Sequence, residues 1–168
     1  VGVPVQELAA TVVTEVIKEA GIEGSLIDDI ILVQTSPNGA APALGRVVAL
    51  DAELGVDVPG MQLDRRCGSG LQAVATAAAH IASGAADLII AGGAESMSNT
   101  EYTGDGKIRW GAKGGNLEFK DRLQEGREQA GGKNHPIPGG MIETAENLRE
   151  EYSIARDRQD KLAVNSHK

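Results

Sequence analysis

Cys67, the only cysteine in the sequence, lies between a short hydrophobic segment and a long run of small apolar residues. The first segment is typical of a strand and the second of a helix, so we expect the thiol at a helix N-terminus. The positive end of the helix dipole favours thiolate over thiol. Gly68 and Gly70 let the backbone approach a substrate closely, and the Cys67 amide can donate to an oxyanion. This position predicts a nucleophile; the alternative is a small buried hydrophobic residue.

Other patterns that carry chemistry give no support for a second kind of site. The sequence around Cys67 lacks the residues of a G-x-S-x-G nucleophile elbow, and neither a dinucleotide fingerprint nor a P-loop occurs. The three histidines, His80, His135 and His167, have no metal-ligand spacing with the cysteine. We therefore expect no metal site.

Composition limits the classes of partner. With 41% hydrophobic and 24% charged residues, the 168-residue chain is expected to be a soluble globular protein. The net charge of −8 disfavours nucleic acid as a partner. No apolar stretch approaches the roughly 20 residues of a membrane span, and no signal peptide is recognisable. A single cysteine cannot form an internal disulfide, which favours a reducing, cytoplasmic location.

Three basic residues, Arg65, Arg66 and Lys133, are candidate contacts for the phosphate groups of a ligand. A solvated surface role is favoured for each of them.

Hydrophobic patterning predicts alternating helices and strands in the first part of the chain. We expect strands at 30–34, 58–63 and 87–91, the last ended by Gly92 and Gly93, and helices at 5–20, 45–54, 70–83, 143–151 and after 154. Such alternation is typical of an α/β domain with a largely parallel sheet between helices. Residues 99–140 are rich in glycine and charge without sustained periodicity, which predicts an inserted loop region.

Two of the expected helices have distinctive apolar patterns. In helix 5–20, apolar residues recur at helical spacing on one face: Leu8, Val12, Val13, Val16, Ile17 and Ala20. Helix 70–83 is apolar or alanine on most faces, so we expect it to be buried on most sides. The chain begins with Val1 directly before a helix and ends at Lys168 inside a helical pattern, from which we expect a truncated sequence.

Several segments, taken together, resemble the thiolases, the acyl-CoA C-acyltransferases. LDRRCGSGLQA (63–73) resembles their nucleophile segment, and DLIIAGGAESMS (87–98) resembles their next strand with its glycine-rich end. MIETAENLREE (141–151) is similar to the segment that resumes the core after the loop domain, and SPNGAAPALGRVVAL (36–50) to a dimer-side loop and helix. These segments occur in the family's order and spacing, and together they extend over nearly the whole chain.

The resemblance implies a thiolase-like layered α-β-α-β-α half with a mostly parallel mixed sheet and a buried central helix. It implies an N-terminal core half at 1–98 without its opening strand, a loop-domain insertion at 99–140, and a truncated continuation at 141–168. Cys67 matches the acyl-accepting cysteine, Gly68 the glycine beside it, and Met141 a methionine that lines the acyl pocket. Many biosynthetic members have His-Met-Gly where this sequence has Gly140-Met141-Ile142, so that histidine is absent here.

The activity implied by the resemblance is acyl transfer through a Cys67 acyl-enzyme, followed by Claisen condensation with acetyl-CoA, or thiolysis of a 3-ketoacyl-CoA in reverse. Coenzyme A thioesters would be substrates, with no tightly bound cofactor, in a homodimer or homotetramer of fatty-acid metabolism. The family's remaining catalytic residues lie in its second half. A ketoacyl synthase-like condensing enzyme is the enzymatic alternative, and a non-catalytic truncated module is the other.

Overall fold

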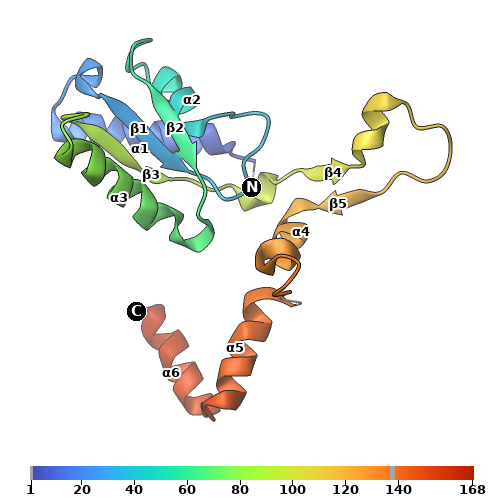
Figure 1. Cartoon of the computed structure of the whole chain (residues 1–168). Helices are drawn as coiled ribbons and strands as arrows, with labels where there is room; N and C mark the ends of the chain where they lie inside the picture. The colour runs from blue at the N-terminus through green and yellow to red at the C-terminus, as the bar shows by residue number, and fades with distance from the viewer. Residues whose placement is uncertain (1, 137–138) are drawn as a thin grey trace. The chain divides into compact units, whose positions relative to one another are not determined.

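The computed structural model describes residues 2–136 and 139–168, and the chain divides into two compact units (Figure 1). The first unit is Val1–Glu101 and the second is Tyr102–Lys168. Two residues of the predicted 99–140 insertion, Ile137 and Pro138, lie outside the described part of the chain. The predicted domain bounds at 98 and 140 stay a prediction.

Three parallel strands form the centre of the first unit. β1 (Asp29–Val33) lies in the middle, with β2 (Gly60–Leu63) on one side and β3 (Ile89–Gly93) on the other. In the register of the sheet, Ile31 pairs with both Met61 and Ala91. The predicted α/β class with a parallel sheet is thereby confirmed.

The end of β3 differs from the prediction. Gly92 and Gly93 do not stop the strand, because they continue the parallel ladder opposite Leu32 and Val33. A Cβ atom at Gly93 would overlap the Val33 side chain. Glycine is therefore needed here for close approach inside the sheet rather than for a turn.

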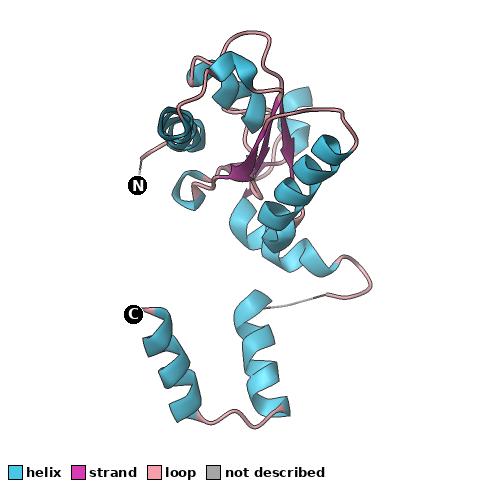
Figure 2. Cartoon of the chain, turned by 90° about the vertical axis from the view of Figure 1, so that its left-hand side faces the viewer, coloured by secondary structure: helices cyan, strands magenta, loops and turns pink. Residues whose placement is uncertain are grey.

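Helices cover both faces of this sheet (Figures 1 and 2). On one face, α1 (Val5–Ala20) and α2 (Leu44–Asp51) share a core with Ile30 and Leu32. On the other face, α3 (Ser69–Ala82) packs against Ile31 and Val33. Since successive strand residues point to opposite faces, the buried segment Ile30–Val33 can supply both cores.

The order of the strands explains why the helices lie on opposite faces. The chain passes from β1 through α2 to β2 on one side, and then through α3 back across β1 to β3. Right-handed crossovers in opposite directions place their helices on opposite faces. All three strands run the same way, so their carboxyl ends share one edge of the sheet, where ligands of such folds commonly bind.

The predicted apolar face of α1 is correct only in part. Val13 and Ile17 are buried, but Leu8, Val12 and Val16 are exposed. The buried stripe consists instead of Val5, Ala9, Ala10, Val13 and Ile17. The helix carries apolar residues around more than one face, while the sheet and α2 cover one of them.

The described residues cover one side of the helix predicted at 70–83, and burial of its other sides stays a prediction. α3 buries Ser69, Ala73 and Ala77 against the sheet. On its outer side, Leu71 and Val74 are 78% and 55% exposed, and Ile81 is exposed as well. The physical reason is that a single sheet covers only one face of a helix.

The second unit contains short elements where the sequence predicted an irregular insertion. β4 (Tyr102–Gly104) pairs antiparallel with β5 (Phe119–Asp121), and α4 (Arg122–Glu128) follows directly. Asp121 caps α4, because its Oδ1 accepts a hydrogen bond from Leu123 N at 2.8 Å.

Short 3-10 turns occur in both units, at Gly24–Leu26, Arg66–Gly68, Met97–Asn99, Gly106–Trp110 and Gln129–Gly131.

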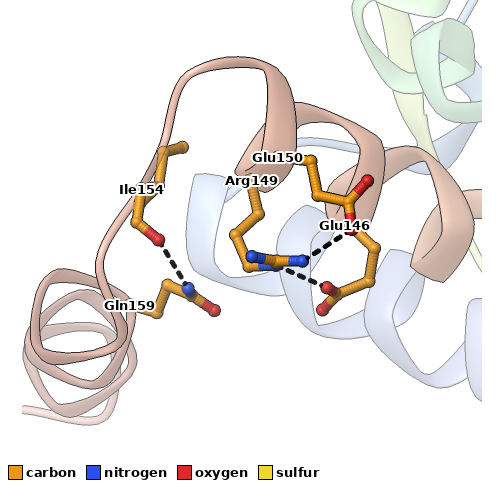
Figure 3. A network of polar contacts seen from close by, with 5 residues as sticks. All are labelled: Glu146, Arg149, Glu150, Ile154 and Gln159. Atoms are coloured by element: carbon orange, nitrogen blue, oxygen red, sulfur yellow. Dashed lines mark hydrogen bonds and ion pairs between the residues drawn. The ribbon is translucent and has the colours of Figure 1, made fainter.

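The two helices predicted near the end of the chain are present as α5 (Gly140–Glu151) and α6 (Arg156–Ser166). Arg149 in α5 donates to Glu146 Oε2 at 2.7 Å and to Glu150 Oε1 at 3.0 Å (Figure 3). Gln159 in α6 donates to the Ile154 carbonyl at 3.1 Å, which holds the connection to the start of that helix (Figure 3). In the described ranges 2–136 and 139–168, no helix has the length and apolar character needed to cross a membrane.

Candidate active site

Cys67 lies at the carboxyl edge of the parallel sheet. β2 ends at Leu63, the turn Arg66–Gly68 carries the cysteine, and α3 begins at Ser69. The thiol-bearing residue is exposed and free. The sequence-based placement of Cys67 between a strand and a helix N-terminus is therefore correct, and the alternative of a buried hydrophobic cysteine does not hold in this structure.

Two side chains close the turn that presents Cys67. Ser69 is 2% exposed, and its Oγ accepts a hydrogen bond from Arg65 N at 2.7 Å. Asp64 Oδ1 accepts from Arg66 N at 2.7 Å, in the manner of Asp at a turn. The Gly68 amide also donates to the Arg65 carbonyl, at 3.1 Å. These short-range bonds explain why the sequence Asp64–Ser69 leaves the strand and enters the helix so abruptly.

The two glycines beside the cysteine leave open space. A Cβ atom at Gly68 would meet only the Arg65 side chain, at 3.7 and 3.8 Å, and one at Gly70 would meet nothing within 4 Å. Packing within the described residues therefore does not require glycine at either position. Contact of Gly68 with a substrate stays a prediction, and so does donation from the Cys67 amide to an oxyanion.

The ends of the other two strands meet this turn through polar contacts that the sequence did not predict. Arg66 Nη1 donates to the Thr35 carbonyl at 3.0 Å, just after β1. Thr35 donates from its amide and its hydroxyl to Glu95 Oε2, at 2.7 and 2.6 Å, just after β3. The sequence favours a solvated surface role for Arg66, but the structure shows that its guanidinium is also bonded to the Thr35 carbonyl. The sequence does contain a signal for these contacts. Thr35, Arg66 and Glu95 each follow a predicted strand within four residues, and the carboxyl ends of parallel strands share one edge of a sheet.

The remaining candidate residues lie elsewhere. Met141 is in the first turn of α5 in the second unit, and its side chain is 74% exposed. Its role in an acyl pocket stays a prediction, because Cys67 belongs to the first unit. Arg65 and Lys133 are exposed, as expected for solvated side chains. Over residues 2–136 and 139–168, no three His, Cys, Asp or Glu side chains come together as a metal site would require.

A family model described as thiolase, N-terminal domain, matches residues 2–168. The chain belongs to the thiolase family. This match covers all the segments on which the resemblance was based, including the Cys67 turn. The ketoacyl synthase-like alternative is thereby set aside in favour of the thiolase family.

Several thiolases of known name or structure are similar to this chain. The beta-ketothiolase BktB of Cupriavidus necator is 37% identical over 165 residues, which is 96% of this chain and 40% of that protein. The acetyl-CoA acetyltransferase of Pseudomonas aeruginosa is 36% identical over 98% of this chain and 41% of that protein. The crystal structure of the Bacillus anthracis acetyl-CoA acetyltransferase matches with a TM-score of 0.87 at 36% identity, over 99% of this chain and 41% of that one.

These matches confirm the layered thiolase-like fold and the assignment of the chain to the N-terminal part of the family. The chain spans about 40% of the length of the curated relatives it matches. The described residues therefore correspond to the N-terminal domain of a thiolase.

Proposed function

We propose that the complete protein containing these residues is an acyl-CoA C-acyltransferase in which Cys67 carries the acyl group. The observation that carries this proposal is the exposed Cys67 at the start of α3, in a chain matched by the thiolase N-terminal domain. The names of two relatives, a beta-ketothiolase and an acetyl-CoA acetyltransferase, support the same reaction class.

The proposed reaction has two steps. The Cys67 thiolate attacks the carbonyl carbon of an acyl-CoA thioester, and the tetrahedral intermediate expels coenzyme A as a thiolate that takes up a proton. The α-carbon of acetyl-CoA then loses a proton to a base and attacks the acyl-enzyme. This forms a 3-ketoacyl-CoA and returns the Cys67 thiolate. Covalent catalysis of this kind divides one difficult acyl transfer into two easier steps.

The chain itself supplies the nucleophile half of this chemistry. Cys67 lies just before the N-terminus of α3, where amide groups favour negative charge, and we propose that the Cys67 amide donates to the tetrahedral oxyanion. Cys67 is the only cysteine among the 168 residues, and the family resemblance implies that the base that deprotonates acetyl-CoA lies outside them. Met141 is proposed to line the acyl pocket, and Gly68 to leave room for the thioester.

We further infer that the protein acts in the cytoplasm as a homodimer or homotetramer and uses coenzyme A thioesters without a tightly bound cofactor. The free thiol of Cys67 supports a reducing compartment. The apolar residues exposed on α1 and α3 support association with further protein surface. Sedimentation of the complete protein would show a dimer or tetramer if this inference holds and a monomer if it does not.

The test of the proposed function is a paired assay on the complete protein and its Cys67→Ser variant. The complete protein is expected to cleave acetoacetyl-CoA with coenzyme A to two molecules of acetyl-CoA. The variant is expected to lose at least about 1,000-fold in rate while keeping its melting temperature, because a serine hydroxyl is a far weaker nucleophile at neutral pH. A complete protein without this activity would favour the non-catalytic alternative.

A further inference from the structure

A chain of polar contacts links the residue before Cys67 to both of the other strand ends. Arg66 Nη1 donates to the Thr35 carbonyl at 3.0 Å, where β1 has just ended. The amide and hydroxyl of Thr35 both donate to Glu95 Oε2, at 2.7 and 2.6 Å, where β3 has just ended. The turn after β2 is therefore held by the strands beside it as well as by its own backbone.

The backbone of Arg66 adds a second, independent observation. Its φ angle is +50°, a conformation that a bulky residue other than glycine rarely adopts. Such a conformation persists only where surrounding contacts determine it, and it is common beside functional groups. Here the contacts are the bond from Arg66 N to Asp64 Oδ1, at 2.7 Å, and the guanidinium anchor on Thr35. Together they set the direction in which the next residue, Cys67, leaves the turn.

A second arginine of the same unit provides a comparison. Arg46 also donates to backbone carbonyls, those of Val56 and Val58, but these precede β2 rather than follow it. Its contacts hold the loop that enters the strand, at the opposite end from the cysteine. Arg46 therefore shares the type of bond made by Arg66 but not its position beside the thiol.

We propose that Arg66 is a positioning residue that, anchored through Thr35 to Glu95, holds the Cys67 thiol at the N-terminus of α3 in its reactive orientation. The proposal rests on the proposed function, since it concerns the nucleophile of that reaction. It assigns to Glu95 the role of fixing Thr35, the residue on which the guanidinium is anchored. A displacement of about 1 Å at a reacting group can cost about 100-fold in rate.

The test measures two rates on the complete protein, each normalised to the amount of titratable Cys67. One is acylation of Cys67 by acetyl-CoA and the other is alkylation by iodoacetamide at pH 7. Arg66→Leu is expected to slow acylation by about 10–100-fold, and Arg66→Lys to recover part of that loss. Glu95→Gln is expected to slow acylation of Cys67 less than Arg66→Leu does. The double variant should be no slower than Arg66→Leu, because both changes interrupt one chain of contacts.

The matched control is Arg46→Leu, which also removes a guanidinium bonded to carbonyl groups. It is expected to lower the melting temperature while leaving both normalised rates unchanged. The proposal is overturned if Arg66→Leu reacts at the wild-type rates, or if the effects of Arg66→Leu and Glu95→Gln multiply as independent changes do. If the unmodified protein transfers no acyl group, the proposed function fails, while the alkylation series still tests the positioning role.

Discussion

A thiol at the first turn of a helix lies close to amide N–H groups that have no partner within the helix. Groups of this kind interact favourably with negative charge that develops on a nearby atom. Cys67 lies in the turn Arg66–Gly68, two residues before α3 begins and therefore next to its N-terminus. We therefore expect the backbone of the chain itself, and not only groups elsewhere in the complete protein, to activate the sulfur.

Alkylation tests this expectation at the residue scale. In the complete protein, Cys67 is expected to react with iodoacetamide at pH 7 severalfold faster than free cysteine, because the turn presents the exposed sulfur beside the N-terminus of α3. The measurement is the second-order rate constant from intact mass against time, with the Cys67→Ser variant as the control for other sites. A rate no higher than that of free cysteine would show that the helix N-terminus does not activate the thiol.

The sequence predicted the position of Cys67 between a strand and a helix correctly but did not predict its surroundings. A single cysteine between a strand-like and a helix-like segment is a local pattern, and local patterns can be read from sequence. The contacts among Arg66, Thr35 and Glu95 join residues 31 and 60 positions apart. Only the order of the strands brings them together, and nothing local in the sequence specifies that order.

At the scale of elements, α2 and β2 approach each other through two glycines. A Cβ atom at Gly60 would overlap the backbone of Gly45 and Arg46, and one at Gly45 would overlap the backbone of Met61. Because backbone atoms cannot rotate away as side chains do, these positions need glycine for packing. This contact fixes α2 on the sheet and, through β2, the start of the turn that carries Cys67.

Replacing Gly60 by alanine is therefore expected to destabilise the complete protein, by about 1–3 kcal/mol or more, as overpacking does. The control is Gly70→Ala in α3, where the added methyl group meets no atom within 4 Å and alanine favours the helix. Thermal unfolding of both variants is the measurement. Equal melting temperatures for the two variants would contradict the packing account.

Asp28 provides an element-scale prediction about pH. Its carboxylate accepts hydrogen bonds from the amides of Asp87 and Leu88, at 2.7 and 2.9 Å, and so ties the start of β1 to the approach to β3. These bonds hold the pKa of Asp28 below its ordinary value of 3.8. A lowered folded-state pKa means that the stabilisation is complete above that ordinary value and is lost as the pH falls below it.

The variant for this prediction is Asp28→Asn, which keeps the shape and one acceptor but removes the charge. The free energy of unfolding of the unmodified protein should exceed that of the variant at pH 7, and the difference should shrink as the pH falls below about 4. Denaturant unfolding of both proteins over this pH range is the measurement. A difference that is constant across the range would show that the charge of Asp28 does not contribute.

The helices and strands of the chain were predictable, and their burial was only partly so. Periodicity located α1, α5 and all three strands of the parallel sheet to within a few residues. It failed for Leu8, Val12 and Val16, which are apolar at helical spacing and yet exposed. Periodicity reports which residues are apolar, whereas burial depends on what lies opposite them. Among the described residues of the first unit, these three are not part of either core cluster.

At the scale of the whole molecule, the outer face of α3 bears directly on stability. Leu71, Val74 and Ile81 are exposed on this helix, directly after the candidate nucleophile. Leaving about 400 Å² of apolar surface in water costs about 10 kcal/mol at about 25 cal/mol per Å². This is comparable to the net stability of an ordinary domain, about 5–15 kcal/mol. We expect further protein surface to cover the face.

Residues 1–168 expressed alone are therefore expected to be poorly soluble or to self-associate, and to show no acetoacetyl-CoA turnover. Replacing Leu71 and Val74 by glutamine should improve the solubility of this polypeptide, because it removes exposed apolar area. The control replaces Lys18 and Glu15, an exposed ion pair on α1, by glutamine, and this change should not improve the solubility. A monomeric, well-folded polypeptide would contradict the packing argument, and measurable turnover would contradict the need for more chain.

The most direct test of the central claim, that Cys67 carries the acyl group, is to trap the intermediate. The complete protein is mixed with isotopically labelled acetyl-CoA, quenched in acid, digested and analysed by peptide mass spectrometry. We expect one labelled thioester on the peptide that contains Cys67, removed by added coenzyme A and absent from the Cys67→Ser variant. A label on any other residue, or a reactive protein with no label on Cys67, would contradict it.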